Sequence, residues 1–174
     1  MSAGALILLL LAWAVWTLTR LGRLEARVAR AWTALDSQLQ RRAGLAEELA
    51  SNYPGALRVQ RATALAAAAA EARAPADGDR ELAENALGRE LRDLPTDLSG
   101  VPVALQTDLA GTTTRVGLAR RFYNDAVRDT RALRRHRFPR LLRLHAGRPL
   151  PRYFDIDERI EEVAGATGAD QPAS

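Results

Sequence analysis

The chain has 174 residues, of which 47% are apolar, and a formal net charge of +4. This length allows one domain with a real core but not two large ones. The absence of cysteine excludes a disulfide framework and any zinc site of the cysteine type. All 25 basic residues are arginine, and 12 of them lie in residues 115–152, whereas nine of the 21 acidic residues lie in residues 71–108. The small net charge therefore hides a strong internal polarity.

The first 19 residues carry no charged side chain. At ~1.5 Å per residue, a helix of this length spans close to the ~30 Å hydrocarbon layer of a bilayer. Residues 1–19 are therefore predicted to be a transmembrane helix. A cleaved signal peptide fits less well, because no basic residue precedes Ala5 and no small-x-small cleavage site separates the apolar run from the next helix. A buried core helix fits less well too, because the segment is apolar on all faces.

Interfacial residues mark the end of this segment. Trp13 and Trp16 lie near it, where indole rings favour the membrane interface, and Arg20 and Arg23 follow directly. Two further arginines, at 27 and 30, extend the basic stretch. The positive-inside rule then predicts an N-terminus outside and the rest of the chain in the cytoplasm.

The remainder of the chain shows helical periodicity and no sustained strand pattern. From Leu21, apolar residues recur in steps of three and four as in a coiled coil, until Arg42 interrupts the series. Helices are expected over residues 21–52, 56–74, 80–94 and 103–137 or beyond. Pro54 and Gly55 should end the first, Pro95 the third, and Asp77 or Asp79 should cap the third.

The expected fold class is all-α, with an N-terminal transmembrane helix that continues into an antiparallel bundle of about four helices. Residues 1–19 form the anchor and residues 20–156 the bundle. Residues 157–174 are expected to be an acidic, disordered tail.

Two stretches, "AWTALDSQLQRRAGL" (31–45) and "ARRFYNDAVRDTRALRRHRFP" (119–139) with its sequel "PRYFD" (151–155), resemble the LemA family. The positions that carry the resemblance are Trp32, Asp36, Gln38, Leu39, Arg41, Arg42, Leu45, Arg120, Tyr123, Asn124, Ala126, Val127, Phe138, Pro139, Tyr153 and Phe154. The resemblance implies a membrane-anchored helical bundle of the kind associated with envelope and organelle membranes. It implies no catalytic residues.

The polar members of this set invite a structural interpretation. Asp36, Gln38, Arg41 and Arg42 belong to the first long helix, and Arg120, Tyr123 and Asn124 belong to the last. We expect a buried salt-bridged network between antiparallel helices, with Asp36 facing Arg120, or Arg41 facing a carboxylate on a neighbour. Trp32 and Tyr123 should be largely buried between the two helices. Ligand binding is the alternative role for the polar set.

No catalytic constellation is visible in the sequence. His136 and His145 lie among arginines without partners for a metal site, and no serine lies in a nucleophile elbow. The segment "GTTTRVG" at 111–117 lacks the lysine and the preceding strand of a phosphate-binding loop. We therefore expect neither an enzyme nor a bound cofactor or metal.

The arginine-rich segment 115–152 admits three interpretations. If the last helix returns to the membrane, Arg134, Arg135, Arg137 and Arg140 lie near anionic lipid headgroups. Phe138, Leu141, Leu142 and His145 would then form an apolar face at the interface. Ion pairs with the acidic segment 71–108 are an alternative. Nucleic-acid binding is the third, but no known nucleic-acid-binding motif is present.

The sequence thus favours a single-pass membrane protein whose cytoplasmic bundle is a non-enzymatic interaction or scaffolding module. Its contacts would be the bilayer through residues 1–19, anionic headgroups, and a protein partner that the sequence does not identify. Homo-oligomerisation is compatible with this interpretation. The alternative function is nucleic-acid binding through residues 115–152.

Overall fold

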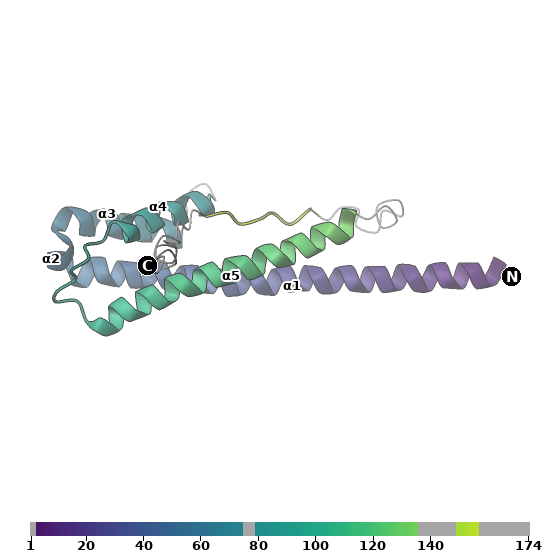
Figure 1. Cartoon of the computed structure of the whole chain (residues 1–174). Coiled ribbons are helices and arrows are strands. Elements are labelled where there is room, and N and C mark those ends of the chain that lie inside the picture. Colours follow the sequence, from purple (N-terminus) through teal and green to yellow (C-terminus); the bar gives the residue numbers. More distant parts are fainter. Residues whose placement is uncertain (1–2, 75–78, 136–148, 157–174) are drawn as a thin grey trace, which may run out of the picture.

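The computed structural model describes residues 3–74, 79–135 and 149–156. Within these ranges the chain forms five helices and no strand, which confirms the all-α fold (Figure 1). The helices are α1 (Ala3–Asn52), α2 (Pro54–Leu57), α3 (Val59–Arg73), α4 (Arg80–Arg92) and α5 (Val103–Arg135).

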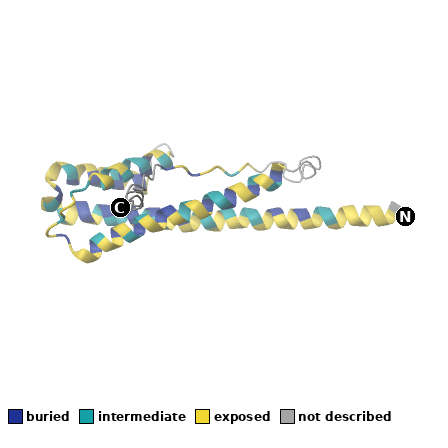
Figure 2. Ribbon diagram, in the orientation of Figure 1, coloured by how far each residue is buried: buried dark blue, intermediate teal, exposed yellow. Residues whose placement is uncertain are grey.

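Helix α1 is a single 50-residue helix, and at ~1.5 Å per residue it is roughly 75 Å long. Its N-terminal part extends beyond the other helices (Figure 1) and is mostly exposed (Figure 2), apart from the partly buried Trp13 and Ala14 and the buried Thr17. The large apolar side chains of this part remain uncovered, and that of Leu8 is 69% exposed. Among the described residues, α1 is the one helix long and apolar enough to cross a membrane.

A tight reversal follows α1. Pro54 cannot continue the α1 hydrogen-bond ladder but suits the first turn of a new helix, so α2 begins there. Arg58 then adopts a positive φ of 66°, a left-handed conformation that side chains disfavour, and it separates α2 from α3. The helix expected over residues 56–74 is therefore divided into a one-turn α2 and an α3 that begins at Val59.

The alanine-rich helix α3 packs closely against α1. It buries Ala62, Leu65, Ala69 and Ala72, and the methyl-sized side chains let the two backbones approach. Helix α4 covers α3 and contributes Leu87 to the same core. The inner face expected for α4 is present, because Ala83 is buried and Leu91 and Leu94 pack against this core.

Helix α5 returns along α1 in the antiparallel direction, as expected (Figure 1). Ion pairs mark the register: Arg41 of α1 lies 3.5 Å from Asp108, and Arg27 lies 2.9 Å from Asp129. A second core, formed mainly by Leu35, Leu39, Val116 and Val127, lies along this contact. The expected extension of α5 to Arg137 falls outside the described residues.

Residues 149–156 form an extended segment beside α5, which we call the strap (Figure 1). Phe154 and Ile156 insert their side chains into the second core, where they are almost fully buried. The strap is therefore part of the bundle although it belongs to no helix.

Candidate functional site

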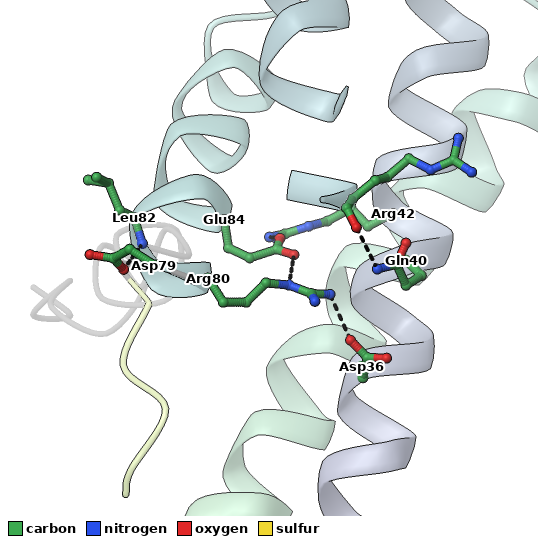
Figure 3. A network of polar contacts seen from close by, with 8 residues as sticks. Asp36, Gln40, Arg42, Asp79, Arg80, Leu82 and Glu84 are labelled. Atoms are coloured by element: carbon green, nitrogen blue, oxygen red, sulfur yellow. Dashed lines mark hydrogen bonds and ion pairs between the residues drawn. The ribbon is translucent and has the colours of Figure 1, made fainter. Parts of the chain in front are cut away.

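A charged network lies between α1 and α4. Arg42, the residue that interrupts the apolar series of α1, is only 3% exposed, and its Nη2 lies 2.7 Å from Oε2 of Glu84. Glu84 also accepts a hydrogen bond from Arg80 Nε at 3.2 Å. Arg80 in turn lies 2.8 Å from Asp36, so that it stands between two carboxylates (Figure 3). The network thus joins two residues of α1 to two of α4.

Local structure in α4 supports this arrangement. Asp79, one of the two expected capping residues, accepts a hydrogen bond from the backbone N–H of Leu82 at 3.0 Å (Figure 3). This cap starts the helix directly before Arg80. Because Arg80 and Glu84 are one helical turn apart, both side chains lie on the face that meets α1.

The ion pairs differ from the expected ones. Asp36 pairs with Arg80 rather than with Arg120, whose guanidinium lies 3.7 Å from Asp155 of the strap. The reason is that α4 lies beside this part of α1, which the sequence of α1 and α5 alone does not reveal. Arg41 does find a carboxylate on a neighbouring helix, Asp108, but both side chains are exposed.

Gln38 of α1 accepts a hydrogen bond from Arg115 Nε at 3.3 Å. Arg115 also donates to Thr112 Oγ1 within α5. Gln38 is therefore an exposed contact between α1 and α5, outside the buried network.

Tyr123 and Asn124 attach the strap to α5. The hydroxyl of Tyr123 donates to the carbonyl oxygen of Arg152 at 2.8 Å. Asn124 makes two hydrogen bonds of 3.0 Å to Phe154, donating to its carbonyl oxygen and accepting from its N–H, as a neighbouring strand would. The Asp155 N–H donates to Glu81 of α4 at 2.8 Å. The strap thus links α5 with α4.

An aromatic cluster lies beneath the strap. The ring of Trp32 lies 5.3 Å from that of Tyr123 and 5.5 Å, edge to face, from that of Phe154. Tyr123 is buried as expected, but Trp32 is only partly buried, because its outer side borders a cavity of about 470 Å³. Burial raises the pKa of the Tyr123 phenol, and the nearby negative charge of Glu81 raises it further.

A second cavity, of about 450 Å³, lies between α4 and α5. Arg42 and Glu84 line this second cavity, whereas Arg80 lines the cavity at Trp32. The charged network therefore separates two hollows. Their volumes are within the range of small-ligand sites, roughly 300–1,000 Å³.

The expected membrane-interface residues differ in their surroundings. Trp13 is partly buried, Trp16 is exposed with the guanidinium of Arg20 5.3 Å from its ring centre, and Arg23 is exposed. Arg135 is exposed at the end of α5. Arg137 and Arg140, together with the apolar face expected at 138–145 and both histidines, lie outside the described residues.

Arg134 is not at the surface, contrary to expectation. Its guanidinium is buried, where it lies 2.5 Å from Oε1 of Glu25 and donates to the carbonyl oxygen of Pro149 at 2.9 Å. It therefore joins α1, α5 and the strap. Glu25 of α1 is the ion-pair partner of this side chain. Glu25 is the single carboxylate among the arginines of residues 20–30, and this was the signal available in the sequence.

Sequence reasoning also missed Glu84 and Arg80. The signal was their spacing of four residues on a helix that opens after a capping aspartate. Among the described residues, no group of three or more histidine or acidic side chains could hold a metal ion. The described residues thus form packed helices, a charged network and two cavities.

The two stretches that carry the family resemblance meet in this region. Trp32 of the first touches Tyr123 of the second, and Asn124 holds the backbone of the sequel at Phe154. Comparisons with protein-family models, with curated proteins and with solved structures give no match. The described residues show a helical protein whose N-terminal helix is, by length and composition, sufficient to cross a membrane.

Proposed function

We propose that the protein is a single-pass membrane protein whose helical bundle acts as a non-enzymatic interaction or scaffolding module. The observation that carries the proposal is the continuity of α1. The same helix begins with the uncovered apolar stretch and ends in the core of the bundle. A bilayer would cover the apolar side chains that the rest of the chain leaves exposed.

The proposed orientation places the bundle at the inner face of the cell membrane. Its support is the four arginines against one glutamate between residues 20 and 30. Arg20 lies against Trp16, a pairing suited to the boundary between lipid tails and headgroups. Arg135, Arg137 and Arg140 are proposed contacts for anionic headgroups, because α5 ends alongside the membrane-facing half of α1.

Membership of the LemA family remains part of this proposal. It is supported by the direct contacts between the two stretches that resemble the family, because residues that act together in the fold explain why both motifs occur in one chain.

Nucleic-acid binding is less well supported by the contacts. Arg115, Arg120 and Arg134 of the basic segment each face a partner within the fold. Arg128 pairs with Asp125 at 3.0 Å, and Arg131 lies over the ring of Tyr153. Phosphate binding by these side chains would require them to exchange internal partners.

Two measurements test the proposal. Extraction of the full chain from membranes should require detergent, and high salt or alkaline washing should leave it in the membrane. A reporter that is active only in the cytoplasm should be active when it is fused after Ser174. Release by salt alone would contradict the anchor, and a reporter active only outside would contradict the orientation.

A further inference from the structure

The cavity between α4 and α5 is an apolar groove with a charged end. Its walls include Leu91 and Leu94 of α4, Leu98 of the following loop, and Leu109 of α5. The buried pair of Arg42 and Glu84 closes one side. The cavity has a volume of about 450 Å³. An apolar group bound there would bury its surface against these leucine side chains, which is energetically favourable.

The strap leads directly into this groove. Its contacts progress backwards along α5, because Pro149 meets Arg134 and Phe154 meets Asn124. Ile156, the last residue of the strap, is 5% exposed and lines the groove together with Ala110. The strap therefore ends at the groove, after running toward the N-terminal part of α5.

The following residues have the chemistry of an occupant. Ile160 and Val163 come four and seven residues after Ile156, the spacing that places three side chains on one face of a helix. The intervening positions hold four carboxylates and one arginine, at residues 157, 158, 159, 161 and 162. A helix over residues 157–163 would therefore have one apolar face and one mainly acidic face.

The net charge of the groove lining is opposite in sign to that of residues 157–163. Its charged lining residues are Arg42, Glu84 and Arg92, of which Glu84 is already shared by Arg42 and Arg80. The lining is therefore net positive, and the segment 157–163 is net negative. Charge complementarity would favour this segment over a basic or neutral helix.

We propose that residues 157–163 of the same chain occupy the groove between α4 and α5, with Ile160 and Val163 against its leucines. Covalent attachment at Ile156 gives the segment a high effective concentration, so weak contacts suffice to hold it. An external helix with a similar apolar face then binds the groove only after this segment leaves. The tail is thus a built-in competitor for the partner site, and this inference does not depend on membrane anchoring.

Because the chain contains no cysteine, disulfide trapping in the full chain in detergent micelles tests the proposal. The trapping pair is Ala110→Cys, in the groove, with Val163→Cys. The matched control keeps Val163→Cys and replaces Ala110→Cys by Ala104→Cys, an exposed α5 position outside the groove lining and on the side of the helix that faces away from it. Under mild oxidation we expect the groove pair to form an intramolecular disulfide at least tenfold faster than the control pair.

A second comparison tests the apolar contact. Adding Ile160→Glu to the groove pair should slow trapping at least fivefold, whereas Gly165→Glu, on the opposite side of the helical repeat, should leave the rate within twofold. Equal rates for the groove and control pairs would overturn the proposal. A disulfide-linked dimer as the main product would overturn it in favour of a second copy as the occupant.

Discussion

At the scale of single residues, Arg42 is the buried charged side chain of α1 that orients α4. It occupies a position of α1 where the apolar series predicts a hydrophobic residue, and α4 supplies Glu84 opposite it. Removing two charges from water is costly, so such a pair is a weak source of stability but a strong constraint on how helices meet. We infer that this pair fixes the rotation of α4 against α1.

Glu84→Gln should therefore be strongly destabilising, because it leaves the guanidinium of Arg42 buried without its carboxylate. We expect the free energy of unfolding to fall by ~3–5 kcal/mol. The measurement is chemical denaturation of the full chain in micelles, followed by circular dichroism. Glu48→Gln, at an exposed position of α1, is the control and should change little. Similar stabilities for the two variants would contradict the assigned role of Glu84.

Tyr123 should make the stability of the protein fall at alkaline pH. Its folded pKa is raised by burial and by Glu81, so between the ordinary value of 10.0 and the folded value the unfolded chain loses the proton first. The free energy of unfolding should therefore decrease as the pH rises through this interval. The chain has no lysine, the other residue type whose ordinary pKa lies just above 10.

Tyr123→Phe should flatten this alkaline decrease, while it lowers stability at neutral pH by the loss of the hydrogen bond to Arg152, about 1 kcal/mol. Denaturation midpoints between pH 8 and 11 measure both effects. Tyr153→Phe, at an exposed ring, should keep the decrease. An unchanged slope in Tyr123→Phe would mean that another group causes it.

At the scale of elements, the sequence predicts what is local. The length of α1 follows from its periodicity and from Pro54. A cap at Asp77 or Asp79 follows from the turn before Arg80, and the structure assigns it to Asp79. The one-turn α2 does not follow, because it depends on the positive φ of Arg58, a conformation that an arginine in the sequence does not predict. The partners of Asp36 and Arg134 were missed for the same reason, since they depend on which helices lie side by side.

The strap is an extended segment whose backbone is bound by side chains of α5, where a sheet would provide a neighbouring strand. Asn124→Ala should remove both hydrogen bonds to Phe154, which together contribute ~1–3 kcal/mol. Amide hydrogen exchange at Phe154 should then accelerate about tenfold or more, with exchange in the middle of α1 unchanged. Thr114→Ala, which loses only a bond within α5, is the control. Unaltered exchange at Phe154 would show that the aromatic cluster alone holds the strap.

At the scale of the whole molecule, Arg134 and Arg135 differ in role although they are neighbours at the C-terminal end of α5. Arg134 is buried in contacts within the fold, whereas Arg135 is exposed. Arg134→Gln should lower the free energy of unfolding by ~2–3 kcal/mol, because it removes a charge-assisted bond that joins α1, α5 and the strap. Arg135→Gln should leave stability unchanged, since this side chain is exposed. Equal losses in the two variants, measured by thermal melts, would contradict the distinction.

The unbroken course of α1 also makes it a spacer of fixed length. Arg42 follows Thr19 by 23 residues, so the groove stands roughly 35 Å above the end of the uncharged stretch. Because α1 is one continuous helix, residues 3–19 and the bundle resist tilting relative to each other. A rotation of residues 3–19 about the helix axis would also rotate the bundle. With residues 1–19 in a bilayer, a partner must present its binding element at this height, which favours proteins that project well beyond the headgroups over those confined to the lipid surface.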